Sequence, residues 1–413
     1  MAKPISNCRI CGSEELSNLF DLGYLTHAGI FNEEGVAPED PLEIVVCSSS
    51  KGCGLVQLKH EFDPNIMYGD NYGYRSGLNQ MMVDHLNDLT KSVMVYGNYS
   101  DKDDVTILDI GSNDGTLLGH FKSLLKNSSN LFGIDPSSSK FKEYYEKDIT
   151  TSNKFFSADE FLKISNGKRA DIVTSIAMFY DLPEPQKIVS EISNILNDDG
   201  TWIVEQSYLP LMLGSNSFDT ICHEHTEYYT LSQFDWMCKK SGLKVVNMEL
   251  NSSNGGSFRL YVKKEISNFV PKESVAQFRY LENLIKSDWA TQFSDFIKRI
   301  QNQKNDLKRY IDVLHGDGKE ICCLGASTKG NILLQYYNLT NDEISAVAEI
   351  NKDKFGTKTP GTLIPIIDEH KAIEKYEYFL VLPWHFKQSF IKNPALKGKK
   401  LIFPLPKFEV ITL

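Results

Sequence analysis

The sequence predicts an α/β chain with three folded parts: a small cysteine-rich domain, followed by two units in which short strands alternate with helices. Three observations support this prediction. Four of the eight cysteines lie within the first 53 residues. Two stretches, 106–116 and 320–331, each have the pattern of a buried strand, a glycine turn and a helix. Further strand and helix patterns alternate around both, as in parallel sheets, and 413 residues suit two or three cores better than one.

Composition and charge exclude several classes of function. The net charge of −10 argues against a general nucleic-acid binder, which would show a basic face. No apolar run reaches the ~18–20 residues needed to cross a bilayer, and the first residues lack the apolar segment of a secretory signal. We therefore expect a cytoplasmic protein with neither nucleic acid nor membrane as a partner, and we favour a monomer.

The early cysteines form two pairs. Cys8 and Cys11 form a C-x-x-C pair, and Gly12 allows the backbone to bend around it. Cys47 and Cys53 form a second pair, with a wider spacing than the usual two to four residues. Four thiolates would close a tetrahedral zinc site without an open position for chemistry. We predict a structural zinc; the alternative is four unliganded cysteines.

The first glycine turn, 109–115, distinguishes between two ligand classes. A dinucleotide fingerprint needs G-x-G-x-x-G to approach a pyrophosphate, whereas acids flank this loop and repel phosphate. Acids suit a sulfonium and an ammonium group, and S-adenosylmethionine carries both. A second strand ends in Asp135, where doubly wound sheets bind ribose hydroxyls. The alternative is a glycine turn without a ligand. The predicted cofactor ligands are Asp109, Gly111, Asn113, Gly115 and Asp135.

The flanking segments complete the first unit. Residues 68–77 are dense in tyrosine and glycine and either fold over a cofactor, with Tyr74 as a contact, or form a surface connection. A helical core face follows through 81–89. A strand over 170–179 should end beside the first strand, so that its last residues and Tyr180 line the pocket. A helix over 188–196 should end at the turn 197–200, before a strand over 201–206.

Two histidines flank an acid at His223, Glu224 and His225, after Cys222. Histidine is the side chain best suited to proton transfer near neutral pH, and the spacing is not that of H-E-x-x-H zinc enzymes. If the segment is extended, His223 and His225 share one face; if it is a tight turn, Glu224 and His225 can converge on one substrate. The alternative is a pair of buried structural histidines.

The remainder of the chain supplies further candidates. The loop 251–257, with Asn254 and Ser257, suits close backbone approach to a polar ligand, although a hairpin turn would look similar. A charged helical region follows to about residue 315, with Phe278, Leu281, Leu284 and Ile285 as expected core positions. The second glycine turn contains Ser327 and Lys329 in place of acids, which favours an anionic group such as a diphosphate.

Taken in order, these motifs resemble the sugar C-methyltransferase family, and the loop at 109–115 resembles the first motif of class I methyltransferases, with Asn113 where many members have glycine. The resemblance extends over nearly the whole chain and includes 255–257, 325–331 and 383–386. It implies four parts: a zinc-binding domain at 1–65, an S-adenosylmethionine-dependent methyltransferase domain at 66–265, a helical connection at 266–315 and a Rossmann-like domain at 316–413.

The resemblance also implies a reaction. Studied family members act on nucleotide-linked deoxy-keto sugars: a C–H bond beside the keto group is deprotonated, and the enolate attacks the methyl group of S-adenosylmethionine. It implies that His225 is the base and Glu224 its electrostatic partner or a second acid or base. Some members have tyrosine where this chain has Cys222, which puts the contact to the keto oxygen in doubt. The predicted substrate contacts are Cys222, His223, Tyr180, Asn254, Ser257, Ser327 and Lys329.

Two alternatives stay open at this point. The methyl group could be transferred to oxygen, with His225 deprotonating a hydroxyl. The chain could instead be a dinucleotide-dependent or non-catalytic protein that uses the turn at Gly325, although Lys329 departs from the open glycine spacing of a dinucleotide loop.

Overall fold

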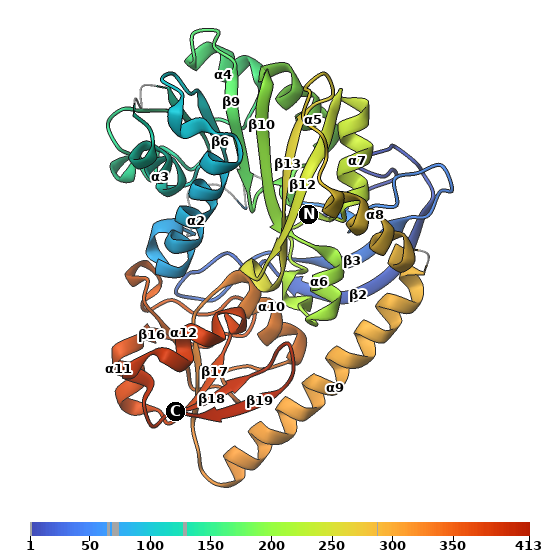
Figure 1. Cartoon of the computed structure of the whole chain (residues 1–413). Helices are drawn as coiled ribbons and strands as arrows, with labels where there is room; N and C mark the ends of the chain where they lie inside the picture. Colours follow the sequence, from blue (N-terminus) through green and yellow to red (C-terminus); the bar gives the residue numbers. More distant parts are fainter. Residues whose placement is uncertain (1, 64–66, 68–73, 127–129, 287) are drawn as a thin grey trace.

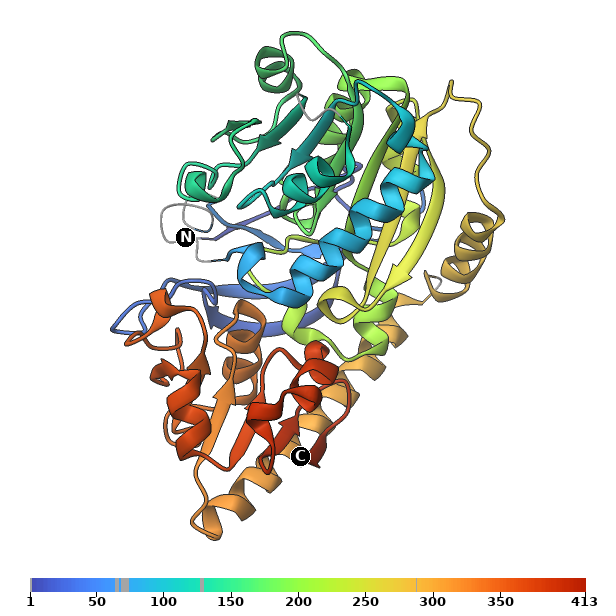
Figure 2. The same cartoon turned by 60° about the vertical axis from the view of Figure 1, so that its left-hand side comes forward.

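The computed structural model describes residues 2–63, 67, 74–126, 130–286 and 288–413. The three largest sheets of the described residues are stacked along the molecule, with the N-terminal strands between the central and the C-terminal units (Figure 1). The turned view in Figure 2 shows the same order, with the blue strands below the green and yellow sheet and above the orange and red unit. The part of the predicted 68–77 segment before Tyr74 lies outside the described residues.

The central unit contains a seven-stranded sheet in the order β12-β13-β10-β9-β6-β7-β8. Its strands are β6 (Ile107–Ile110), β7 (Leu131–Ile134), β8 (Ile149–Ser152), β9 (Ala170–Ile176), β10 (Leu196–Ser207), β12 (Leu243–Asn251) and β13 (Ser257–Lys264). The strands from β8 to β10 are parallel, and β13 is antiparallel to both of its neighbours. The predicted parallel sheet is confirmed, and an antiparallel edge pair extends it.

The helices of this unit connect the strands. They are α2 (Gln80–Tyr96), α3 (Thr116–Leu124), α4 (Ala158–Ile164), α5 (Pro185–Ile195), α6 (Leu209–Gly214) and α7 (Leu231–Lys240). Two predicted strand boundaries are wrong. The strand expected over 170–179 ends at Ile176, and Phe179 lies in the 3₁₀ turn η4 (Phe179–Asp181). Residues 197–200 were expected to form a turn before the strand, but they lie inside β10, where the register against β9 shifts between Leu196 and Thr201. An irregularity in the pairing accommodates these polar residues within the strand.

The N-terminal sheet has four strands in the order β11-β4-β3-β2. They are β2 (Leu16–Thr26), β3 (Glu39–Cys47), β4 (Val56–Leu58) and β11 (Glu227–Tyr228), while β1 (Lys3–Pro4) and β5 (His60–Glu61) form a separate pair. Strand β11 follows directly after the His223–His225 segment and pairs with β4. The cysteine-rich domain and the candidate catalytic segment therefore share one sheet.

The C-terminal sheet has the order β16-β15-β14-β17-β18-β19, and only β19 runs antiparallel to its neighbour. Its strands are β14 (Ile321–Leu324), β15 (Ala346–Glu349), β16 (Ile366–Asp368), β17 (Tyr378–Val381), β18 (Lys400–Phe403) and β19 (Glu409–Thr412), and its helices are α10 (Thr328–Tyr337), α11 (Glu369–Lys375) and α12 (Lys387–Lys392). The predicted fold class, a zinc-ribbon-like domain and two Rossmann-like units, is confirmed.

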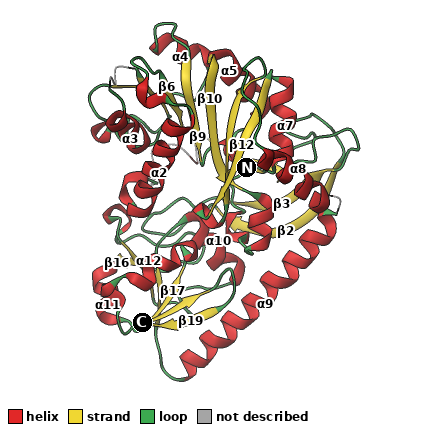
Figure 3. Cartoon of the chain, in the orientation of Figure 1, coloured by secondary structure: helices red, strands yellow, loops and turns green. Residues whose placement is uncertain are grey.

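Two helices, α8 (Glu273–Lys286) and α9 (Trp289–Gly316), connect the central and C-terminal units, and α9 runs along the flank of the latter (Figure 3). Expected core positions on α8 are partly wrong, because Leu281 and Leu284 are 51% and 60% exposed. The side chains that α8 buries include Val275 and Glu282 instead. No helix in the described part of the chain combines the length and apolar content needed to cross a membrane.

Candidate active site

The four N-terminal cysteines converge on one point. Their Sγ atoms all lie within 4.8 Å of one another, and the Cys8–Cys53 and Cys11–Cys47 Sγ pairs are 3.5 Å apart. A tetrahedral zinc with bonds of about 2.3 Å separates its sulfur ligands by about 3.8 Å, so the four thiols fit a zinc ion. Glycine at position 52 allows the loop between Cys47 and Cys53 to pass close to the cysteine cluster, because a Cβ there would lie 2.5 Å from Cys47 Sγ.

The first glycine loop contains three residues with positive φ, namely Gly111, Asn113 and Gly115. Gly111 has φ 74° and donates its N–H to the carbonyl of Ile134 at the end of β7. Gly115 has φ 78°, and a Cβ there would lie 2.7 Å from the Tyr145 ring. The Tyr145 hydroxyl donates to the Asn113 carbonyl at 2.7 Å. Tyr145 was not predicted, because it follows the second strand at a distance with no motif of its own.

Three buried acids, Asp109, Asp114 and Asp135, lie in or beside this loop. The Asp135 carboxylate accepts from Asn113 N at 2.8 Å and from the N–H and hydroxyl of Ser137 at 2.6 Å. Burial raises the pKa of Asp109 to about 7, while the Thr174 hydroxyl, which donates to it at 2.6 Å, opposes that rise. A site lined by carboxyl groups fits a sulfonium and an amino group and repels a pyrophosphate. These residues therefore fit S-adenosylmethionine.

The described end of the tyrosine-rich segment lies on this loop. Asn113 Nδ2 donates to the carbonyl of Tyr74 at 3.1 Å, and Asn113 Oδ1 accepts from Ser76 N at 2.9 Å. The Asp114 carboxylate accepts from Gly77 N at 2.9 Å and lies 3.6 Å from Arg75 Nε. The segment from Tyr74 to Gly77 therefore covers the predicted cofactor loop through its backbone and Arg75.

A buried ionic cluster at the carboxyl end of β10 was not predicted. Glu205 is 3% exposed, accepts from Arg259 Nε at 2.7 Å and from Asn251 Nδ2 at 3.0 Å, and forms a short contact with His85. Burial alone would raise the pKa of Glu205, but His85 and Arg259 lower it below its usual range. His85 lies on the helical face that was expected to be core, and its partners are far away in the sequence.

His225 lies in a tight turn. Its backbone N–H donates to the carbonyl of Cys222 at 3.1 Å, and its ring Nδ1 lies 2.9 Å from the carbonyl oxygen of Thr220. Because a carbonyl only accepts, Nδ1 carries the proton and Nε2 carries a lone pair. Burial lowers the pKa of His225 to about 4, and the charge of Lys329 contributes to this effect. The ring is therefore neutral near pH 7, with Nε2 able to accept a proton.

Glu224 faces the N-terminal and C-terminal domains. A Cβ at Gly29 would lie 2.6 Å from Glu224 Oε1 and 3.5 Å from the Thr328 hydroxyl. Among the described residues Oε2 has no hydrogen-bond partner although it is buried, and burial raises the pKa of Glu224. The Cys222 thiol lies beside this carboxyl group and is itself completely buried. Glu224 thus keeps a polar atom available for a ligand.

The His223 side chain packs into the N-terminal domain rather than beside His225. Its ring stacks on His27 at 4.2 Å and contacts Phe62 edge-on at 4.9 Å. Its Nε2–H donates to the carbonyl of Asp40 at 3.1 Å, and burial lowers its pKa to about 3. His223 is therefore embedded in the N-terminal domain, and the structure does not place it with His225.

A small enclosed pocket lies beside His225. The Tyr180 ring is 4.2 Å from the His225 ring, and both line this pocket. Glu227, a residue that was not predicted, also lines it and lies 3.7 Å from Arg9 Nε of the zinc-binding turn. Its other lining residues are Ser207, Leu209, Met212, Thr220 and Tyr228.

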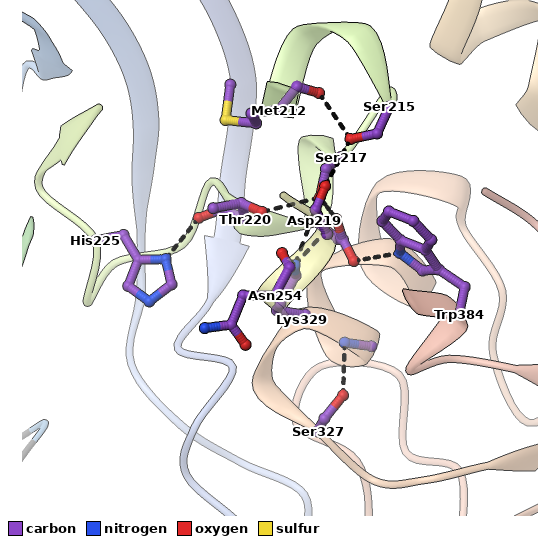
Figure 4. Close-up of polar contacts among 12 residues, drawn as sticks. Met212, Ser215, Ser217, Asp219, Thr220, His225, Asn254, Ser327, Lys329 and Trp384 are labelled. Atoms are coloured by element: carbon purple, nitrogen blue, oxygen red, sulfur yellow. Dashed lines mark hydrogen bonds and ion pairs between the residues drawn. The ribbon is translucent and has the colours of Figure 1, made fainter. Parts of the chain in front are cut away.

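The remaining predicted substrate contacts are used within the protein. Lys329 Nζ donates to the Asn254 carbonyl at 2.8 Å and lies 3.9 Å from an Asp219 oxygen (Figure 4). The hydroxyl of Ser257 donates to the Ser253 carbonyl, and the hydroxyl of Ser327 accepts from Gly330 N at the start of α10. The structure therefore brings Asn254 and Lys329 together at the contact between the central and C-terminal units.

Comparisons with known proteins agree with this arrangement. Three families match successive parts of the chain: a zinc-binding domain over residues 8–68, a methyltransferase domain over 83–248 and a C-methyltransferase C-terminal domain over 252–406. The zinc-binding match confirms the expectation from the four cysteines. The methyltransferase matches confirm the predicted enzyme class and agree with S-adenosylmethionine as the methyl donor.

The chain is also similar to individual proteins. The C-methyltransferase NovU of Streptomyces niveus is 27% identical over the whole of this chain and 98% of its own. Among solved structures, the plantazolicin methyltransferase BpumL is 13% identical over 44% of this chain and 85% of its own, with a TM-score of 0.35. The mitomycin 7-O-methyltransferase MmcR is 15% identical over 46% and 59%, with a TM-score of 0.32.

The order of zinc-binding, methyltransferase and C-terminal domains is the same in the family matches as in the three sheets. NovU matches along the full length rather than over the methyltransferase part alone. The chain is a methyltransferase, and over the full length that it shares with NovU its family matches combine an N-terminal zinc-binding domain with a C-methyltransferase C-terminal domain.

Proposed function

We propose that this methyltransferase transfers a methyl group from S-adenosylmethionine to a carbon atom beside the keto group of a nucleotide-linked deoxy sugar, with His225 as the base. The observation that carries the proposal is the hydrogen bond from His225 Nδ1 to the Thr220 carbonyl, which leaves a neutral ring with an unprotonated Nε2. A positioned base of this kind contributes about 10²–10⁴ in rate. The sugar itself is an inference from the resemblance of the sequence motifs.

Each of these residues would have a separate role in the reaction. S-adenosylmethionine supplies an electrophilic methyl group on a sulfonium, and Asp109, Asp135 and the loop from Gly111 to Gly115 would hold it. His225 Nε2 would take the proton from the sugar carbon. Glu224, whose pKa burial raises, would donate a hydrogen bond to the enolate oxygen when its carboxyl group holds a proton. Cys222 would leave that contact to Glu224, because its thiol is a weak donor.

We also propose that the domains divide near residues 65, 265 and 315. In this division the zinc holds the N-terminal sheet together through its four cysteines. Strand β11 joins that sheet to the catalytic segment.

Proton exchange tests this function without methyl transfer. We would incubate a panel of nucleotide-diphosphate-linked deoxy-keto sugars with the protein and S-adenosylhomocysteine in D₂O, and follow deuterium at the carbon beside the keto group by NMR. The proposal predicts exchange by the wild type and its loss in His225→Asn. Methyl transfer from S-adenosylmethionine to a sugar oxygen without any such exchange would favour the O-methyltransferase alternative instead.

A further inference from the structure

An aspartate lies at the contact between the central and C-terminal units. Asp219 is fully buried, in the short 3₁₀ turn η5 (Phe218–Thr220). Its Oδ2 accepts from Trp384 Nε1 at 2.8 Å, and its Oδ1 accepts from the Ser217 hydroxyl at 2.8 Å. Lys329 Nζ lies 3.9 Å from the same Oδ1 (Figure 4). Donors from two segments of the C-terminal domain therefore surround one carboxylate of the central unit.

The same turn supplies the carbonyl oxygen that accepts a hydrogen bond from the ring of His225, the candidate base. Ser217 bonds to Thr220 twice: its carbonyl accepts the Thr220 N–H at 3.1 Å, and the two hydroxyl oxygens are 3.0 Å apart. The carbonyl of Thr220 then accepts from His225 Nδ1 at 2.9 Å. The direction of that carbonyl depends on the turn that Asp219 anchors. A continuous set of hydrogen bonds thus leads from Trp384 to the His225 ring.

The packing leaves little freedom for this turn. Gly255 has φ 89°, and a Cβ there would lie 3.0 Å from both the Ser217 hydroxyl and the Trp384 ring. Lys329 is 13% exposed in its side chain and also donates to the Asn254 carbonyl. A buried carboxylate with two hydrogen-bond donors and an ion pair keeps a defined position, since losing any of these partners leaves a buried polar group unsatisfied.

We propose that the C-terminal domain positions the catalytic base, because Trp384 and Lys329 hold Asp219 and thereby aim the Thr220 carbonyl that selects the Nδ1–H form of His225. Asp219, Trp384 and Lys329 are positioning residues in this account. It rests on the proposed function, in which His225 removes the proton. It also assigns Lys329 a role inside the protein in place of binding a substrate diphosphate.

The test is a tryptophan replacement with a matched control. Trp384→Phe removes the N–H donor and keeps an aromatic ring, whereas Trp236→Phe removes an N–H with no hydrogen-bond partner among the described residues. In ¹⁵N-histidine spectra, assigned with His225→Asn, the wild type and Trp236→Phe should show protonated Nδ1 and unprotonated Nε2 for His225. Trp384→Phe should shift both signals towards a tautomer mixture.

The same variants are assayed with S-adenosylmethionine and a keto-sugar substrate. Trp384→Phe should lower kcat by about 10- to 100-fold, as expected for a misplaced catalytic group, with KM for the sugar unchanged. Unchanged His225 signals in Trp384→Phe would overturn the positioning role. A raised KM at constant kcat would also overturn it and assign this region to substrate binding.

A second pair of variants covers the case in which Trp384→Phe does not fold. Asp219→Asn and the double variant Asp219→Asn with Lys329→Met both remove the anchor, and the double variant leaves no unpaired lysine. Both should shift the His225 signals, and wild-type signals in the folded double variant would contradict the proposal. Full activity of His225→Asn would instead remove the proposed function, while the tautomer measurement would still decide the positioning role.

Discussion

The two glycine turns of this protein have nearly the same backbone and opposite surroundings. Gly111 and Gly325 both have positive φ. Gly111 donates its N–H to the carbonyl of Ile134 in β7, and Gly325 donates its N–H to the carbonyl of Ala348 in β15, at 2.8 Å in both cases. Each turn also has an acid from the next strand that accepts a loop N–H. Asp135 accepts from Asn113 at 2.8 Å, and Glu349 accepts from Ala326 at 2.9 Å.

The side chains around the two turns differ. The first is lined by acids, with Asp109 two residues before Gly111, whereas the same place before Gly325 is taken by the buried thiol of Cys323. In the second turn Lys354 Nζ donates to the Ala326 carbonyl at 2.6 Å, and Lys329 turns towards Asp219. A strand–turn–helix unit therefore provides a backbone frame, while its side chains decide whether it binds a ligand or supports a neighbouring site.

The largest effect is expected where the second turn meets Glu224. The Thr328 hydroxyl at the start of α10 lies close to Gly29, and a Cβ there would displace the Glu224 carboxyl. Gly29→Ala should lower kcat by about 10- to 100-fold without a large change in melting temperature, since its φ is not positive. Gly316→Ala, with open space around it, is the control. Wild-type kcat in Gly29→Ala would exclude a role for the Glu224 position.

Alanine substitutions at Gly111 and Gly325 test whether the two turns have separate roles. A left-handed backbone costs a residue with Cβ about 1–2 kcal/mol, and the added Cβ would lie 2.9 Å from Met178 in Gly111→Ala and from Pro383 in Gly325→Ala. Both variants should therefore melt at lower temperature. Only Gly111→Ala should weaken S-adenosylmethionine binding, by about tenfold or ~1.4 kcal/mol. Equal weakening in both, measured by calorimetry, would contradict separate roles.

The pH dependence of S-adenosylmethionine binding tests the role of Asp109, whose place in the second turn is taken by Cys323. Asp109 has its pKa raised by burial to about 7, so it is neutral below that pH and ionised above it. A cationic ligand favours the ionised form, so affinity for S-adenosylmethionine should rise by up to about tenfold per pH unit towards pH 7 and then level off. Asp109→Asn should flatten this profile, and an unchanged slope in that variant would assign it to another group.

The same pKa has a consequence for stability. Because the folded pKa of Asp109 lies above its ordinary value, the folded state holds the proton more tightly than the unfolded state. The contribution of Asp109 to the free energy of unfolding is therefore present at about pH 4 and is lost as the pH rises through about 7. Denaturant titrations of the wild type and Asp109→Asn at pH 5 and pH 8 measure this contribution.

The smallest expected effect is at the helix start of the second turn. Ser327 accepts from Gly330 N as the N-cap of α10. Ser327→Ala should lower the free energy of unfolding by about 1 kcal/mol and leave the KM for the sugar unchanged. A large rise in that KM, measured at saturating S-adenosylmethionine, would show that Ser327 binds substrate as the sequence motif suggests.

Local patterns in the sequence were enough to predict the strand–turn–helix arrangement of the central and C-terminal units. The four cysteines, the two glycine turns and the strands next to them follow from short motifs that neighbouring residues largely determine. The antiparallel pair β12 and β13 did not, because a strand pattern does not state its direction. The start of β10 was misplaced because polar residues 197–200 are tolerated inside an irregular stretch of this strand.

The site was predictable in part. The tight turn at His225 was one of two alternatives, since extended and turned backbones use the same residues. Contacts between distant segments, such as Glu205 with His85 and Arg259, leave no local signal. Lys329 could be predicted as a cation at a helix start, but its partner Asp219 is brought to it only by the packing of two domains.

The most direct test of the two roles is calorimetric titration of S-adenosylmethionine into the wild type, Asp135→Ala and Glu349→Ala. Each substitution removes the acid that accepts a loop N–H in one turn. We expect wild-type affinity in Glu349→Ala and a loss of about tenfold or more, ~1.4 kcal/mol, in Asp135→Ala. Wild-type affinity in folded Asp135→Ala, or weakened binding in Glu349→Ala alone, would contradict the assignment of the first turn as the cofactor site.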